Sequence, residues 1–101
     1  MATKIKKLPE AEIKRELKTI PNWTYENGKL HREFVFKDFM QAISFMTGVA
    51  ITAQMMNHHP EWFNVYNKVR VDLCTHDVNG LTVLDFTLAA HMEEFASNFR
   101  Q

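Results

Sequence analysis

Histidines are the residues of this chain best suited to proton transfer near neutral pH, and they stand at positions 31, 58, 59, 76 and 91. His58 and His59 directly precede Pro60, which disfavours helical geometry at the residue before it, so the pair is expected at the end of a helix. His76 is expected where a strand passes into a loop, a position from which a side chain can reach a cleft. Convergence of these three would suit general acid–base catalysis, although spacing alone favours unrelated structural histidines. His31 and His91 are expected in an exposed strand and a surface helix, without a chemical role.

A zinc site and a cysteine nucleophile are the competing interpretations of the same region. Adjacent histidines cannot easily ligate one ion together, and the chain has no His-x-His, His-x-x-x-His or Cys-x-x-Cys pair. Asp77 beside His76 could add an oxygen ligand. Cys74, the only cysteine, is expected inside a strand as a small packing residue. Because the usual ligand pairs are missing, no metal is expected. A glycine-rich phosphate loop and a nucleophile elbow are also missing, so kinase and dehydrogenase activities are excluded.

The length and composition indicate one globular domain over residues 1–101. A chain of 101 residues is long enough for one domain and too short for two, and residues 1–7, with Lys4, Lys6 and Lys7, are expected as a flexible tail. Twelve basic and twelve acidic residues give a formal net charge of zero, which argues against direct nucleic-acid binding through phosphate attraction. A single cysteine and the lack of an apolar signal-peptide core at the start predict a cytoplasmic protein.

The first half of the chain is divided by proline and Asn-Gly signals. A helix is expected from about Pro9 to Thr19, because proline suits the first helical position. Strands at 23–25 and 30–36 flank Asn27-Gly28, a dipeptide that tolerates the positive φ angles of a tight type I′ hairpin turn. Asp38 with Gln41 then resembles a capping box and opens a long second helix.

The long helix, from Phe39 to Met56, carries no charge and is nearly long enough to cross a bilayer. It contains five polar residues and lacks the usual flanks, so a helix buried on more than one side is expected rather than a membrane span. A partner subunit is the expected source of the extra cover. The predicted core face consists of Phe39, Ala42, Ile43, Met46, Val49, Ala50, Ala53 and Met56, whereas Phe45, Ile51 and Met55 lie outside it.

The second half of the chain repeats the alternation of strands and helices. Strands are expected at 63–66 and 68–75, followed by a turn at Asn79-Gly80. Thr82 with Asp85 is a second capping box, which opens a helix whose inward residues are Leu84, Leu88, Met92, Phe95 and Phe99. The order αββαββα predicts an α+β fold: a four-stranded antiparallel sheet with helices packed on one face.

A spaced motif lies within residues 57–85: His58-His59-Pro60, then Tyr66, His76 and Asp85. In residue types and in every spacing it strongly resembles the motif of pterin-4a-carbinolamine dehydratases. The predicted element order also matches the fold of that family, so the resemblance extends over nearly the whole chain. A match at this many positions is specific, unlike a lone pair of histidines.

The resemblance implies dehydration of 4a-hydroxytetrahydrobiopterin to quinonoid dihydrobiopterin in tetrahydrobiopterin recycling, with no metal and no bound cofactor. His58, His59 and His76 would be the catalytic set, with His59 or His76 as the acid at the 4a hydroxyl and His58 as a base or orienting group. Trp62 could wall the cleft, and Asp85 is expected as a helix cap rather than a catalytic acid. The pterin would lie against Asn57, His58, His59, Cys74, Thr75, His76 and Asp77.

Several positions depart from the family pattern. Gln54 stands where a charged or histidine side chain, commonly glutamate, is usual, and a neutral amide can hydrogen-bond but cannot act as an ion. Leu84, Asn57 and Cys74 stand where some animal members have arginine, aspartate and serine. These differences concern the rate and the pH optimum more than the class of reaction.

The resemblance also implies partners. Family members form homodimers and homotetramers, and animal members also act as dimerisation cofactors of a homeodomain transcription factor through the long helix. The apolar excess on that helix is compatible with either association. A coactivator role would add a nuclear location to the cytoplasmic one. A pterin-binding protein without activity is a third possibility, which Gln54 keeps open.

Overall fold

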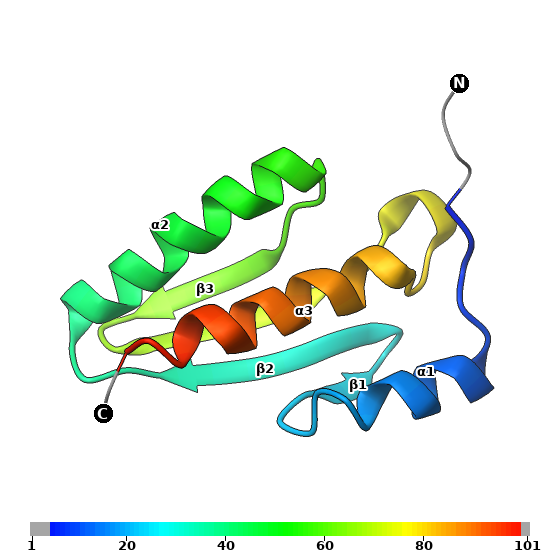
Figure 1. Ribbon diagram of the computed structural model, residues 1–101, viewed down its shortest axis with the longest axis horizontal. Coiled ribbons are helices and arrows are strands. Elements are labelled where there is room, and N and C mark those ends of the chain that lie inside the picture. The colour runs from blue at the N-terminus through cyan, green and yellow to red at the C-terminus, as the bar shows by residue number, and fades with distance from the viewer. Residues whose placement is uncertain (1–4, 100–101) are drawn as a thin grey trace.

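A four-stranded antiparallel sheet carries the fold. The computed structural model describes residues 5–99, and the strands are ordered β1-β2-β4-β3 in the sheet. Helices α2 and α3 lie across one face of the sheet (Figure 1), so the predicted α+β architecture is confirmed. The elements are α1 (Glu10–Leu17), β1 (Thr24–Glu26), β2 (Lys29–Val35), α2 (Phe39–Met56), β3 (Glu61–Val65), β4 (Lys68–Leu73), the short 3-10 helix η1 (His76–Val78) and α3 (Val83–Ala96).

Local turn and strand signals set most of the element boundaries. Asn27 and Gly28 have φ angles of 54° and 78°, as a type I′ hairpin turn requires. Strand β3 begins two residues earlier than predicted, because Glu61 is already paired with Asp72 of β4. Strand β4 ends earlier than predicted, so Cys74 lies just beyond it and not inside it.

The N-terminal segment is held against the loop that follows β4. The amide of Leu8 donates to the carbonyl oxygen of Leu81 at 2.8 Å, and the side chain of Lys7 lies where a Cβ on Gly80 would be. Of the tail predicted over residues 1–7, residues 1–4 with Lys4 lie outside the described residues. Residues 5–7 are exposed. This contact brings the start of the described chain close to the region where the histidines gather.

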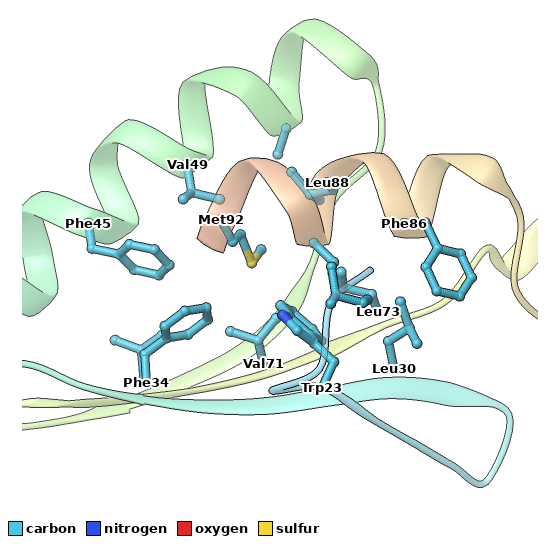
Figure 2. Packing of buried hydrophobic residues seen from close by; sticks show 14 of the residues in the cluster. Trp23, Leu30, Phe34, Phe45, Val49, Val71, Leu73, Phe86, Leu88 and Met92 are labelled. Atoms are coloured by element: carbon cyan, nitrogen blue, oxygen red, sulfur yellow. The ribbon is translucent and has the colours of Figure 1, made fainter. Parts of the chain in front are cut away.

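The face that helix α2 turns to the sheet overlaps the predicted one but is shifted from it. Phe45, predicted to lie outside the core stripe, is fully buried, and its ring centroid lies 4.7 Å from that of Phe34 (Figure 2). Phe39, Ile43 and Ala50, predicted inside the stripe, are exposed. The prediction was right for Ala42, Val49 and Ala53. It was wrong for the other positions named here because nearly every position of this helix is apolar, so periodicity selected the face only in part. The buried residues are Ala42, Phe45, Val49 and Ala53.

The outer side of α2 remains apolar and uncovered within the chain. By length and composition alone this helix could span a membrane, and only 22% of it is buried. Within the described residues it is buried along one side, so burial on more than one side is not achieved by this chain alone. The exposed apolar residues are Phe39, Met40, Ile43, Ile51 and Met55, a set called the α2 outer face below.

Candidate active site

Four segments meet at one end of the sheet. The end of α2, the start of β3, the segment after β4 and the start of α3 gather there (Figure 1). They enclose an open cavity of about 400 Å³, a volume within the usual range for small-molecule sites. The cavity is lined by Ile5, Asn57, His58, His59, Pro60, Glu61, Cys74, Thr75, His76, Asp77 and Leu84. All seven residues predicted to bind a pterin are therefore brought together, and their part in binding stays a prediction.

His58 is directed into the protein by the way α2 ends. Asn57 adopts a left-handed conformation with φ of 53°, and the amide of His58 donates to the carbonyl oxygen of Ala53 at 3.0 Å. His58 lies at the end of a helix as predicted, and it is buried there, with 7% of its surface exposed. Its Nε2 lies 2.6 Å from Oδ1 of Asp85, a short contact typical of an imidazole paired with a carboxylate.

Asp85 is both the helix cap that the sequence predicted and the partner of His58. It is fully buried, and its Oδ2 accepts hydrogen bonds from the amide of Thr82 at 3.0 Å and from Oγ1 of Thr75 at 2.8 Å. Because Thr75 spends its only hydroxyl hydrogen on Asp85, the 2.8 Å contact between the hydroxyl groups of Thr75 and Thr82 has Thr82 as donor. The capping box of α3 thereby fixes the position of a cavity-lining imidazole.

His59 faces solvent and is held by Gln54. Its Nε2 lies 2.9 Å from Oε1 of Gln54, which can only accept, so the imidazole donates. Gln54 does not line the cavity and acts on it through His59. The neutral amide at this position therefore keeps the orienting hydrogen bond that a glutamate would make, without its charge.

His76 belongs to an exposed network with Glu61 and Lys29. Nε2 of His76 lies 3.0 Å from Oε2 of Glu61, and Nζ of Lys29 lies 2.7 Å from Oε1 of the same carboxylate. Hydrogen bonds from Lys29 and His76 lower the pKa of Glu61, and the bond to Glu61 raises the pKa of Lys29. Glu61 is therefore a carboxylate that accepts from both neighbours.

Cys74 lies beside this network as a thiol. Burial is the main reason why the pKa of Cys74 is raised, and the nearby Glu61 carboxylate adds to the effect. Since the thiolate is the nucleophilic form, these surroundings disfavour a cysteine nucleophile. The interpretation of Cys74 as a nucleophile, set aside on the sequence, gains no support.

The three cavity histidines share one hydrogen-bonding arrangement. In each ring Nε2 is bonded to an oxygen: Asp85 for His58, Gln54 for His59 and Glu61 for His76. Within residues 5–99 none of the three Nδ1 atoms has a hydrogen-bond partner. The arrangement thus fixes a hydrogen on each Nε2 and leaves Nδ1 to take or give a proton, which is the chemistry of a general acid–base site.

Comparison with known proteins identifies the family. The family model described as pterin 4 alpha carbinolamine dehydratase matches residues 6–95. The chain belongs to this family. A Solibacter usitatus relative that bears the family name is 54% identical over 91 residues, which cover 90% of this chain and 96% of that protein. The pterin-4-alpha-carbinolamine dehydratase of Drosophila melanogaster is 56% identical over 77 residues, 74% of this chain and 40% of that longer protein.

A solved structure supports the same assignment. The crystal structure of a transcriptional coactivator/pterin dehydratase from Brucella melitensis matches with a TM-score of 0.88 and 41% identity, covering 90% of this chain and 99% of that chain. The resemblance inferred from the motif, and the classification as a hydro-lyase of this family, are thereby confirmed at the level of the family.

Some residues considered on the sequence lie away from the dehydratase-family cavity. Trp62 packs against the hydrophobic core and does not line the cavity. His31 is half-buried and pairs with Asp72 at 2.9 Å. His91 does not face solvent freely, since its Nε2 lies 2.9 Å from the hydroxyl of Thr52 on α2. Neither of these histidines lines the cavity, which agrees with the structural role expected for them.

Glu61 is the functional candidate that the sequence interpretation missed. It follows Pro60 directly and lies opposite Asp72 at the first pair of β3 and β4, so it is adjacent to the predicted site. Its partners His76 and Lys29 are 15 and 32 residues away in the chain. Its position directly after His-His-Pro was the available signal. Ile5, Pro60 and Leu84 complete the lining that was not predicted.

Proposed function

We propose that this chain dehydrates 4a-hydroxytetrahydrobiopterin to quinonoid dihydrobiopterin by histidine acid–base catalysis. The observation that carries the proposal is the cavity in which His58, His59 and His76 each have Nε2 bonded to an oxygen and Nδ1 without a partner in the described chain. The membership of the dehydratase family supplies the class of substrate.

The reaction requires one proton to be given and one to be taken. A protonated histidine donates to the 4a hydroxyl, because hydroxide is a poor leaving group, and the bond from C4a to oxygen breaks to release water. The lone pair of the adjacent ring nitrogen forms the new double bond, and the proton of that nitrogen passes to a second histidine. Atoms balance as substrate to product plus water, and a proton moved between the two imidazoles restores the enzyme.

The surroundings of the three histidines favour different roles. His58 is buried against Asp85, whose carboxylate can stabilise an imidazolium as it forms, so His58 is the proposed base. His59 and His76 are exposed and can exchange protons with solvent between turnovers. One of them is the proposed acid at the 4a hydroxyl. Asp85 acts through His58 and is a positioning residue.

The test is the rate of 4a-hydroxytetrahydropterin breakdown, followed by absorbance, in the presence and absence of a chelator. The wild type is expected to exceed the spontaneous rate with and without chelation. The variants His58→Ala, His59→Ala and His76→Ala are compared with His91→Ala, a histidine outside the cavity. Loss of a catalytic acid or base is expected to slow the reaction by about 100-fold or more, while His91→Ala stays within about twofold. An unchanged spontaneous rate with the wild type would sink the proposal and leave a pterin-binding protein without activity.

The cofactor requirement of the reaction and the location of the protein in the cell form part of the same proposal. Dehydration in tetrahydrobiopterin recycling would need no metal and no bound cofactor, because two proton transfers account for the whole step. A cytoplasmic location is proposed from the single cysteine, Cys74. Persistence of the activity after exhaustive chelation tests the first statement, and microscopy of the tagged protein in its own cells tests the second.

The α2 outer face favours a second role in association. Its most exposed members are Met55, Met40 and Ile51, at 82%, 71% and 60%. Exposed apolar side chains gathered on one helix are a usual mark of protein association. We propose that two or four copies of this chain pair through it. The Brucella melitensis protein is named as a transcriptional coactivator as well as a pterin dehydratase, so the same face is the proposed site of a coactivator contact.

Light scattering on Met55→Glu and Ile51→Glu tests the association. Either charge is expected to convert the oligomer to a monomer without loss of the fold, whereas Lys18→Glu, on the exposed end of α1, should not. Phe45 is unsuitable for this purpose, because it is a core residue and its replacement would unfold the domain. A monomeric wild type would contradict the association, and a pull-down of a transcription factor abolished by Met55→Glu would support the coactivator role.

A further inference from the structure

Three side chains of the cavity, from three different segments, form a group of possible metal ligands. Glu61 begins β3, Cys74 follows β4, and His76 begins η1. One ligand atom from each lies within 4.8 Å of the other two, and Nε2 of His76 is already 3.0 Å from Oε2 of Glu61. This set is called the Glu-Cys-His cluster below.

The donor types of the cluster match the preferences of zinc. A thiolate, an imidazole and a carboxylate are its usual ligands, and three protein ligands leave a fourth position for water. Ligand atoms around a tetrahedral zinc lie about 3.3–3.7 Å apart, for metal–ligand bonds of about 2.0–2.3 Å. The cluster must therefore contract by about 1 Å. His76 and Glu61 have side chains that are 73% and 42% exposed, so both are free to rotate by this amount.

The charge around the cluster also accommodates a divalent ion. Lys29 holds Oε1 of Glu61 at 2.7 Å and leaves Oε2 to His76. An ion bound between Oε2 of Glu61 and Nε2 of His76 displaces the hydrogen that His76 donates, which moves to Nδ1 of the neutral ring, and the pair with Lys29 persists. Zinc displaces the proton of the Cys74 thiol to solvent, and the resulting thiolate and the Glu61 carboxylate balance the two charges of the ion. The oxygen ligand is Glu61 and not Asp77, which the sequence had suggested.

We propose that Zn²⁺ binds Glu61, Cys74 and His76 and reversibly inhibits the enzyme. All three ligands line the cavity, so a bound ion would occupy part of the substrate volume. It would also engage the imidazole of His76, which then cannot serve the acid–base reaction. Inhibition rests on the proposed function, whereas binding of the ion does not.

Binding is tested on the full chain by calorimetric titration with Zn²⁺, and with Co²⁺ as a coloured substitute for zinc. One ion per chain is expected, with a near-ultraviolet absorption from thiolate to Co²⁺. The variants Cys74→Ser and Glu61→Gln are expected to weaken binding at least about tenfold, since even indirect contacts to a metal ligand change affinity by about 10- to 100-fold. Asp77→Asn, which alters a cavity carboxylate outside the cluster, is the matched control and should bind normally.

Inhibition is tested in the same samples by the rate of 4a-hydroxytetrahydropterin breakdown. Zn²⁺ is expected to lower the rate of the wild type, and a chelator is expected to restore that rate. The same Zn²⁺ concentration is expected to lower the rate of Cys74→Ser much less. Equal zinc affinity of Cys74→Ser and the wild type, with circular dichroism showing both folded, would overturn the site. Binding at the cluster without any slowing of an active enzyme would overturn the inhibition alone. If the wild type proved inactive, calorimetry and the Co²⁺ spectrum would still decide the site.

Discussion

Helix α3 carries two hydrogen-bonded carboxylates about two turns apart, and only one of them is bonded to a residue of the candidate active site. Asp85, in the first turn, is fully buried and bonded to His58. Glu93, two turns further on, accepts from Nε of Arg32 at 2.7 Å and from Nε1 of Trp23 at 2.8 Å. A cavity of about 400 Å³ lies beside each of them.

The partners make the difference between these two regions. A guanidinium and an indole carry donors and no acceptor atom, so neither partner of Glu93 can take up a proton. Asp85 faces an imidazole that can hold one or two protons, beside two further histidines. A cavity and a satisfied carboxylate therefore occur in both places, and the titratable partner is what makes one of them a candidate for chemistry.

The substitution Asp85→Asn is expected to have the largest effect. Asparagine offers one acceptor oxygen where aspartate offers two, and three buried donors, from His58, Thr75 and Thr82, need an acceptor there. The free energy of unfolding should therefore fall by about 3 kcal/mol. The rate of pterin dehydration should fall by about 100-fold, because His58 loses the group that orients it. Chemical denaturation and initial rates measure the two quantities. A variant with the wild-type rate would show that His58 needs no carboxylate.

The matched substitution Glu93→Gln should separate stability from activity. It weakens the half-buried pair with Arg32 and keeps an acceptor for Trp23, so a loss of about 1 kcal/mol is expected from the free energy of unfolding. The dehydration rate should stay within about twofold of the wild type. A fall in rate comparable to that of Asp85→Asn would remove the distinction between the two ends of the helix.

Replacement of Gln54 probes the weakest orienting contact of the site. Gln54→Ala removes the acceptor from Nε2 of His59 and is expected to lower the dehydration rate by about threefold to tenfold, because the exposed ring becomes free to rotate. Gln54→Glu restores an acceptor and should retain at least the wild-type rate. Steady-state kinetics on both variants measure this, and equal rates for alanine and glutamate would show that His59 needs no orientation.

The smallest effect is expected from the titration of Glu61. Its pKa is lowered by Lys29 and His76, so its contribution to folding is present above the ordinary value of 4.5 and is lost as the pH falls through the lower value in the folded state. Exposure to solvent limits the contribution to less than about 0.5 kcal/mol. Thermal melts of the wild type and Glu61→Gln from pH 7 to pH 3 should therefore differ slightly at neutral pH and converge in acid. If the difference in melting temperature between the two proteins grew on acidification, the lowered pKa of Glu61 would be contradicted.

Local signals explain what the sequence could predict. The hairpin at Asn27-Gly28 and the cap formed by Thr82 and Asp85 involve residues no more than three positions apart, and both are present as expected. The cavity lining was also predictable, because the motif brings Asn57 to His59 and Cys74 to Asp77 together on the family fold.

Contacts across the sheet explain what the sequence could not predict. The burial of Phe45 depends on the rings of Phe34 in β2 and Phe36 just beyond it, which lie 11 and 9 positions earlier in the chain. The bond between His58 and Asp85 joins residues 27 positions apart, and that of Lys29 with Glu61 joins residues 32 positions apart. Such pairs depend on how distant segments pack against one another, which periodicity alone does not give.

The attachment of the N-terminal segment has a practical consequence for handling the protein. Ile5 lines the cavity and Leu8 is bonded to Leu81, so an affinity tag placed before residue 1 would join the chain only a few residues from the cavity wall. The 14 residues of α3 separate its first turn, at the cavity, from its last by about 20 Å. Purification tags, surface anchors and fluorescent labels on this enzyme therefore belong at the C-terminal end.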